Sequence, residues 1–409
     1  MKETNFLKIS LSLLFALTLA SCSDSENGVS QSEQPKIEGT VAEVNSYGQL
    51  VTSFTPAQMK EAGLDYADLM HVTLADTIEL TGVPFLTSFN EGKMFTPLFV
   101  DYNGRGDDFG LGVLSSDMHN LVGGHAGDKV KITLEKKAGY KEDYDLLKSV
   151  FPIERREGET PEVYANFRPI TTTGMELGLV YRSSNPLNCK NNPGRYAVVD
   201  SLSRLAGIRT ELDLADTEAA VEKYMATKDY AATYCPQLFA QGRTLCMGLS
   251  VELFGSRFKQ AMAQMARFIL SHEGPYLVHC NEGKDRCGFV SLLLEALAGA
   301  TVDELRSDYM LTMINYYKIS NGDASYQLRQ RISADRMLWM LCHPEAASNM
   351  LHVNWDNTTA EVSSLTPTTL QQAVRIYLQE GGLTAAECDQ LKALLQGKAQ
   401  AVEQSESAL

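Results

Sequence analysis

Short runs in which apolar and polar residues alternate fill the N-terminal part of this chain. Between residues 39 and 134 the runs are rich in β-branched residues, and glycine and asparagine separate them. Runs of this length between turn residues are typical of β-strands. The clearest examples are residues 40–44, 71–74 and 129–134. The pattern predicts a small β-barrel or sandwich, and we place a small β-barrel domain at residues 37–137.

The pattern changes beyond residue 160, where strand-like runs alternate with segments of helical periodicity. A charged, partly helical connector is expected at 138–160. The expected strands are 180–183, 208–214 and 275–278, and the expected helices are 197–206, 256–271 and 289–298, the last closed by Gly299. Alternation of strands and helices predicts an α/β fold.

Two further helices are expected near the C-terminus. Residues 366–395 carry apolar residues at helical spacing, interrupted at Gly381-Gly382, and Thr384 with Glu387 forms a capping-box pattern. We expect both helices to pack on the α/β domain. The domain therefore spans residues 161–400, and a polar tail follows at 401–409.

The first residues have the pattern of a targeting segment. Lys2 and Lys8 precede a short apolar run at 9–19, which is too short to cross a membrane. The following Leu19-Ala20-Ser21-Cys22 resembles a bacterial lipobox, in which the cysteine is lipidated and becomes the mature N-terminus. We expect a lipoprotein signal peptide at 1–22, lipidation of Cys22, a polar linker at 23–36 and export to the outer membrane, on its periplasmic or surface face. An ordinary signal peptide with an incidental cysteine is the alternative.

Composition narrows the choice of partners. The 409 residues are 44% hydrophobic and carry a net charge of −15, with a pI near 5.0. An acidic surface disfavours nucleic acid and anionic lipid as partners of the whole surface, so any anionic substrate must be captured locally. Eight cysteines minus Cys22 leave seven, an odd number, and their spacing suggests neither a disulfide framework nor a metal site.

Residues 279–288 form the most informative segment, His-Cys-Asn-Glu-Gly-Lys-Asp-Arg-Cys-Gly, between an expected strand and an expected helix. Cys280 and Arg286 lie six positions apart, so one tight loop could place a thiolate and a planar guanidinium around a phosphate group. Backbone N–H groups curled at the start of a helix would bind phosphate oxygens and favour the thiolate. The segment predicts a cysteine-dependent phosphatase that needs no cofactor.

Several other loop residues have predicted roles. Gly283 permits a turn with positive φ, Gly288 permits close helix packing, and His279 orients the loop. A Walker-type nucleotide loop is a poor alternative, because Asp285 stands where that loop needs serine or threonine. The predicted phosphate-binding residues are Asn281, Glu282, Gly283 and Lys284.

The leaving group needs a general acid within hydrogen-bond reach. Asp285 is the nearest candidate, and it could later activate the water that hydrolyses the phosphocysteine. Asp213 and Asp216, at the end of an expected strand, are the alternatives, although such aspartates more often cap helices or turns.

The loop resembles that of the atypical bacterial protein-tyrosine phosphatases of the His-Cys-x-x-Gly-Lys-Asp-Arg-Thr-Gly type. Asn166-Phe167-Arg168, Tyr181-Arg182-Ser183, the segment 208–214 and the segment 307–312 resemble further landmarks of that family. The resemblance covers roughly residues 164–317. It implies a doubly wound α/β fold with a mostly parallel central sheet flanked by helices, no metal, and Asp285 as the acid. It also implies activity on phosphotyrosine, with phosphoserine, phosphothreonine and phosphoinositides as further substrates of family members.

Two residues depart from the family pattern. Ala215 replaces an arginine, and Cys287 replaces a hydroxyl residue that would donate to the leaving thiolate. Hydrolysis of the phosphocysteine would then be slow. Cys287 could instead form a reversible disulfide with Cys280, or be a small buried packing residue.

The N-terminal domain has its own resemblance. Residues 39–52 and 127–130 are similar to the C-terminal β-barrel half of S-adenosylmethionine hydroxide adenosyltransferases, but the catalytic half of that family has no counterpart here. We therefore expect substrate positioning or partner binding from the barrel.

The leading hypothesis is a protein-tyrosine phosphatase that acts through a phosphocysteine on phosphorylated proteins or peptides. The alternatives are a phosphoinositide or inositol-phosphate phosphatase, and a non-catalytic module that binds phosphorylated ligands.

Overall fold

A computed structural model describes residues 34–101, 109–148, 154–191 and 193–398. The described residues from Pro35 onward form one compact unit. The predicted signal peptide, its Cys22, nearly all of the linker and the polar tail lie outside the described residues. Those assignments stay predictions. Among the described residues, no helix combines the length and the apolar character needed to cross a membrane.

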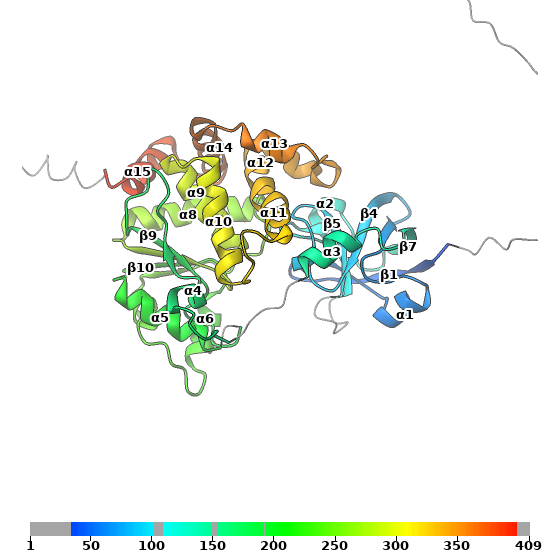
Figure 1. Ribbon diagram of the computed structural model, residues 1–409, viewed down its shortest axis with the longest axis horizontal. Coiled ribbons are helices and arrows are strands. Elements are labelled where there is room, and N and C mark those ends of the chain that lie inside the picture. Colours follow the sequence, from blue (N-terminus) through cyan, green and yellow to red (C-terminus); the bar gives the residue numbers. More distant parts are fainter. Residues whose placement is uncertain (1–33, 102–108, 149–153, 192, 399–409) are drawn as a thin grey trace, which may run out of the picture. The chain divides into compact units, whose positions relative to one another are not determined.

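In the described residues, seven strands form a closed barrel (Figure 1), which confirms the predicted small β-barrel. They are β1 (Lys36–Val44), β2 (Leu50–Thr52), β3 (Leu69–Leu74), β4 (Ile78–Leu86), β5 (Pro97–Asp101), β6 (Phe109–Val113) and β7 (Lys129–Lys136). The spatial order is β1-β2-β6-β5-β4-β3-β7, and β7 pairs with β1 to close the barrel. Neighbours are antiparallel except β4 and β5. Closure removes the open sheet edges that would otherwise invite aggregation.

The alternating sequence pattern fills the barrel. On β3, Met70, Val72 and Leu74 are fully buried, and Val72 and Leu74 pair with Ile132 and Val130 of β7. Side chains of alternate strand residues point to the same face, so these positions form the interior. Short helices α1 (Pro56–Glu61), η1 (Phe89–Glu91) and α2 (Met118–Val122) connect the strands.

The second part of the chain contains a sheet with the order β11-β10-β12-β9-β8. The strands are β8 (Arg168–Pro169), β9 (Val180–Ser183), β10 (Thr210–Asp213), β11 (Thr244–Cys246) and β12 (Tyr276–His279). All neighbours are parallel except β8 and β9. His279 pairs with Asp213 on one side and Ser183 on the other, so three strands end at the same edge. Ligands of open α/β sheets bind at this carboxyl edge.

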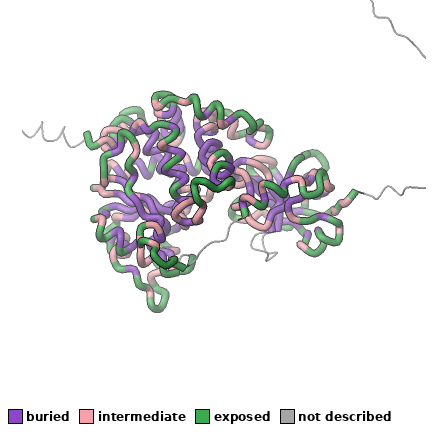
Figure 2. Tube along the Cα trace, viewed as in Figure 1, coloured by how far each residue is buried: buried purple, intermediate pink, exposed green. Residues whose placement is uncertain are grey.

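Helices cover both faces of the sheet (Figure 1), as the fold class predicted. Leu277 of β12 packs with Val199 and Leu202 on one face, whereas Val278 belongs to the core on the other face. Figure 2 shows the resulting burial of the sheet and of the helices against it. The first face carries α4 (Pro161–Ala165), α5 (Arg195–Leu205), α6 (Glu218–Met225) and α7 (Cys235–Ala240). The second carries α8 (Ser256–Ser271), α9 (Asp285–Ala298), α10 (Val302–Asn315), α14 (Pro367–Glu380) and α15 (Ala385–Leu395).

The remaining helices lie in the connector and before α14. They are α3 (Lys141–Leu147), α11 (Ala324–Gln330), the π-helix η3 (Arg331–Asp335), α12 (Arg336–Cys342), the 3-10 segment η4 (Pro344–His352) and α13 (Thr358–Ser363). The two predicted C-terminal helices are present, and Thr384 with Glu387 makes the capping box.

One predicted boundary was wrong, and it matters for the site. Helix α9 begins at Asp285, four residues before the expected start. Gly288, which the sequence predicted to permit close helix packing, is inside the helix, where a Cβ would lie 2.7 Å from the ring of Tyr309. Close packing against α10 therefore requires a glycine within α9. As a result, Asp285 and Arg286 lie on the first turn of the helix.

Candidate active site

The segment 280–284 joins β12 to α9 at the carboxyl edge of the sheet. It lines a cavity of about 270 Å³. The residues of the predicted site that line this cavity are Cys280, Asn281, Glu282, Lys284, Asp285 and Arg286. The structure thus brings the predicted nucleophile, acid and arginine together, whereas Gly283 faces the protein interior.

Cys280 lies beneath the N-terminus of α9 and is only 4% exposed. The N-cap residue of α9, Lys284, supplies no side-chain hydrogen bond to the first turn. The first N–H groups of a helix have no partner within the helix, and they carry partial positive charge. The arrangement around Cys280 is therefore suited to binding an anion.

Gly283 is required at its position by both conformation and space. Its φ is +75°, as the sequence predicted, and a Cβ there would lie 2.5 Å from the carbonyl oxygen of Ser183 and 2.8 Å from Nδ2 of Asn166. Its own carbonyl accepts hydrogen bonds from Arg182 (2.9 Å) and Thr312 (3.2 Å). The loop is therefore pressed against the end of β9.

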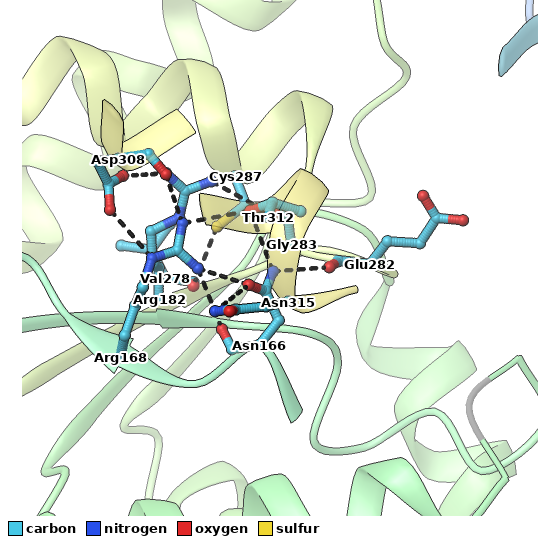
Figure 3. A network of polar contacts seen from close by, with 10 residues as sticks. All are labelled: Asn166, Arg168, Arg182, Val278, Glu282, Gly283, Cys287, Asp308, Thr312 and Asn315. Carbon is cyan, nitrogen blue, oxygen red and sulfur yellow. Dashed lines mark hydrogen bonds and ion pairs between the residues drawn. The ribbon is translucent and has the colours of Figure 1, made fainter. Parts of the chain in front are cut away.

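A buried network of charged and polar side chains supports the loop (Figure 3). Asp308 on α10 forms ion pairs with Arg168, at 3.0 Å, and with Arg182. Arg168 also donates to Oδ1 of Asn166 (2.6 Å), whose Nδ2 donates to the carbonyl of Glu282 (3.2 Å). Burial alone would raise the pKa of Asp308, but the two guanidinium groups hold it well below its usual range.

A second carboxyl group lies beside this network. Glu295, on α9, is fully buried. Burial and the negative charge of Asp308 raise its pKa well above its usual range. The neutral form of Glu295 is therefore favoured, and Asp308 is the carboxylate that pairs with the two buried arginines.

Asp285, the first residue of α9, has partners on both carboxyl oxygens. The Tyr309 hydroxyl donates to Oδ1 at 3.4 Å, and the Lys284 ammonium lies 3.3 Å from Oδ2. These contacts fix the carboxyl group at the cavity wall.

The side chains of Lys284 and Glu282, two of the predicted phosphate-binding residues, also contact the protein. Nζ of Lys284 donates to Oδ1 of Asn90 and lies 5.1 Å from the centre of the Tyr317 ring. The Tyr317 hydroxyl donates to the Glu282 carboxylate. The side chain of Lys284 is thus held between the barrel and the α/β domain.

Arg286 projects from the same turn of α9 and lines the cavity. One of its N–H groups donates to the carbonyl of Leu249 at 2.7 Å. Since a guanidinium carries five N–H groups in a planar fork, this bond can orient Arg286 while other donors meet a ligand.

The alternative acids, Asp213 and Asp216, do not line the cavity. Oδ1 of Asp213 accepts the N–H groups of Ala215 (2.8 Å) and Asp216 (3.0 Å), and burial raises its pKa. Oδ2 of Asp216 accepts from Asn185 (2.7 Å), whose N–H donates to the carbonyl of Asn281 (3.2 Å). Both aspartates therefore hold the turns behind the loop.

His279 anchors the strand end that leads into the loop. It is fully buried, with Nε2 3.0 Å from Oε1 of Glu211 and Nδ1 3.9 Å from Oδ1 of Asp213. Burial lowers the pKa of His279, but the carboxyl groups of Asp213 and Glu211 outweigh this and raise it overall. The ring thus ties β12 to β10 at the level of the loop.

Cys287 is fully buried, and its S–H donates to the carbonyl of Val278 at 3.3 Å. Burial raises its pKa to about 11. All seven cysteines in the described residues are free. These observations favour the prediction of a packing residue over that of a second reactive thiol.

Residues 171–397 match the tyrosine phosphatase family. The match covers more than half of the 409 residues. The chain belongs to the tyrosine phosphatase family. No curated protein matches it. Family membership supports a phosphatase function for the cavity at the start of α9.

Sequence reasoning gave no role to the residues that hold the loop of this phosphatase in place. Arg168, Arg182, Asp308 and Thr312 come from three distant segments, and all are buried. The sequence did contain a sign of this network, because Arg182 stands in a short apolar strand pattern and a buried arginine needs a buried partner. It did not show that the partner is Asp308.

The barrel supplies the other side of the cavity of this phosphatase. The lining residues from this part of the chain are together called the barrel wall: Asn45, Tyr47, Gln49, Phe89, Asn90, Gly112, Val113, Leu114, Ser115, Ser116 and Met118. All of them precede the matched region. Among the described residues, no group of three or more histidine, cysteine, aspartate or glutamate side chains is placed to hold a metal ion.

Proposed function

We propose that this phosphatase is a cysteine-dependent protein-tyrosine phosphatase that forms a phosphocysteine on Cys280. The observation that carries the proposal is that Cys280, Asp285 and Arg286 line one cavity at the N-terminus of α9. A nucleophile, a proton donor and a phosphate-binding fork thus converge on a helix terminus that favours anions.

In the first step, the Cys280 thiolate attacks phosphorus. The S–P bond forms as the P–O bond to the leaving group breaks, and Asp285 transfers its proton to the leaving oxygen. Arg286 and the backbone N–H groups of the loop bind the phosphoryl oxygens. Their positive charge offsets the negative charge on those oxygens in the transition state.

In the second step, the Asp285 carboxylate accepts a proton from water. The resulting hydroxide attacks phosphorus, the S–P bond breaks, and inorganic phosphate leaves with Cys280 again a thiolate. The proton taken from water restores the acid form of Asp285, so atoms and charges balance over the cycle.

Phosphotyrosine in a protein or peptide is the proposed substrate, and family membership is its main support. Phosphoinositides, inositol phosphates and binding without turnover are the competing outcomes. The test is phosphate release by the full chain in the presence of EDTA. The substrates are phosphotyrosine, phosphoserine and phosphothreonine peptides, phosphoinositides and inositol hexakisphosphate.

Variants separate the roles of the three residues. Cys280→Ser should abolish turnover, whereas Cys189→Ser, at a partly buried free cysteine that does not line the cavity, should leave it unchanged. Asp285→Asn should lower kcat about 10²–10⁴-fold on phosphotyrosine. Its effect should be far smaller on 4-nitrophenyl phosphate, whose leaving group needs little protonation. Arg286→Lys should also lower kcat, because lysine cannot replace the planar fork.

Each outcome has a clear meaning. Turnover that survives Cys280→Ser would exclude the phosphocysteine mechanism. An equal effect of Asp285→Asn on both leaving groups would remove Asp285 from the role of acid. Phosphopeptide binding without any turnover would favour the binding module.

We also propose that the chain is exported and held on the outer membrane by lipid at Cys22. The Leu19-Ala20-Ser21-Cys22 sequence supports this. Incorporation of a labelled fatty acid in the expressing bacterium, with Cys22→Ser as the comparison, tests the proposal. Equal labelling of both proteins would contradict it.

A further inference from the structure

The barrel wall contains no charged side chain. The charged residues that line the cavity, Glu282, Lys284, Asp285 and Arg286, all belong to the catalytic loop and the first turn of α9, and their formal charges sum to zero. One phosphate group brings a charge of about −1.5 to −2. The cavity can balance one such group through Arg286 and the helix terminus. The other cation of the described lining, Lys284, lies 3.3 Å from the Asp285 carboxylate and donates to Asn90, so Asp285 already offsets its charge.

Barrel residues next to the barrel wall pack against the α/β domain, and the contacts reach α9. Phe95, between η1 and β5, packs edge-to-face on Phe254 with ring centres 5.6 Å apart, and Phe254 lies 5.1 Å from Phe289 on α9. Arg336 donates to the carbonyl of Met94 at 2.6 Å. The hydrogen bond between Lys284 and Asn90 joins the wall to the loop itself.

Tyr47 is an exposed aromatic residue of the barrel wall. It is 65% exposed, and hydrogen bonds fix the turn on which it lies. Oδ1 of Asn45 accepts the N–H groups of Tyr47 (3.0 Å) and Gln49 (3.1 Å). The carbonyl of Gly48 accepts from His119 of α2 at 2.9 Å. An exposed aromatic ring on a fixed turn at the rim of a cavity is typical of a binding anchor.

We propose that the barrel wall recognises the peptide that flanks the phosphorylated residue, with Tyr47 as its anchor at the rim. This inference rests on the proposed function and names the substrate class: singly phosphorylated peptide segments, not polyphosphorylated inositols. The amide side chains of Asn45 and Gln49 fix the turn that carries Tyr47, since Nδ2 of Asn45 donates to Oε1 of Gln49 at 3.2 Å. The uncharged wall and the net charge of −15 both disfavour a polyanion.

The test compares two substrates of the full chain. One is a decapeptide with a central phosphotyrosine, and the other is phenyl phosphate, which ends at the ring and has no flanking peptide. Tyr47→Ala should lower the ratio of kcat/KM for the decapeptide to kcat/KM for phenyl phosphate about tenfold. Leu205→Ala is the matched control, because Leu205 is 78% exposed and does not line the cavity. It should leave the ratio unchanged.

A second measurement separates failure of the inference from failure of the proposed function. Calorimetry measures binding of the decapeptide to the Cys280→Ser protein, with and without Tyr47→Ala. Weaker binding with Tyr47→Ala supports the barrel wall even if the wild type shows no turnover. An unchanged ratio together with unchanged binding would overturn the inference while leaving the mechanism intact. Preferred turnover of inositol hexakisphosphate would also overturn it.

Discussion

Asp308→Asn tests whether the buried network beneath the loop is held together by a single charge. The substitution keeps the size of the side chain and removes its charge. Asp308 is the carboxyl group that pairs with Arg168 and Arg182, and the two guanidinium groups lower its pKa and so favour its ionised form. After the change, two buried guanidinium groups would face each other with no anion between them.

The expected loss of stability is large. Removing one partner of a buried ion pair costs about 3–5 kcal/mol. The side chains of Asp308, Arg168 and Arg182 are 8%, 10% and 1% exposed, so solvent screens them little, and the two pairs share one carboxylate. We therefore expect a loss within this range, about 4 kcal/mol, against a total of about 5–15 kcal/mol for a protein domain. Because Arg182 also holds the Gly283 carbonyl, kcat should fall about tenfold to a hundredfold.

Urea unfolding followed by circular dichroism measures the change. Asp303→Asn is the matched control, because Asp303 is on the same helix but its side chain is 92% exposed and pairs with Arg306 at 3.4 Å. An exposed pair of this kind contributes less than about 0.5 kcal/mol.

The pH dependence provides a second check. The pKa of Asp308 is lower in the folded than in the unfolded protein, so its stabilisation is present above the unfolded value of about 3.9 and is lost as pH falls through the folded value. The difference between wild type and Asp308→Asn should therefore shrink as pH falls below about 4. A loss no larger than that of Asp303→Asn, or one that does not shrink in acid, would refute the reasoning.

Three further predictions follow from the loop and its helix. Gly283→Ala should lower the free energy of unfolding by about 2–5 kcal/mol, the sum of about 1–2 for positive φ and 1–3 for overpacking. Gly207→Ala is the control: Gly207 has a φ of +66° but open space around it, so the change should cost only the first part. Equal losses on urea unfolding would contradict this. Burial and the carboxylate beside it raise the pKa of Glu295 above its unfolded value, so wild-type stability should fall by up to about 1.4 kcal/mol per pH unit above about pH 4.3. Glu295→Gln should abolish that slope and be more stable at pH 8, and parallel pH profiles would show that the assignment is wrong. The Cys287 thiol has a pKa of about 11 and is fully buried, so it should react with iodoacetamide only after unfolding. Cys280, at the cavity wall, should react in the native protein. Peptide mapping that finds both cysteines labelled at the same rate would refute this.

Local sequence predicted most elements of the phosphatase domain well. Helix α8 has the bounds that the apolar spacing predicted, and the capping box at Thr384 is present. Periodicity and capping depend on residues that are close in the chain, so they can be read without knowledge of the fold. The start of α9 could not be predicted in this way. A glycine inside the helix is explained by its close packing on Tyr309, which is distant in sequence.

The same distinction applies to the site. Cys280, Asp285 and Arg286 could be predicted together because one short, contiguous segment of the chain carries all three. The sequence left Asp213 and Asp216 open as acids, and only the tertiary structure directs their carboxyl groups to backbone and side-chain donors behind the loop.

The sequence by itself indicated the chemistry that we propose for the loop, since phosphate chemistry needs a short, contiguous run with a fixed spacing. Tertiary structure alone decided what holds the loop and what surrounds it. Asp308 meets Arg182 across 126 positions of the chain, and Asn90 meets Lys284 across 194. Contacts of this range depend on how the sheet, α10 and the barrel pack, and no local pattern of residues encodes that packing.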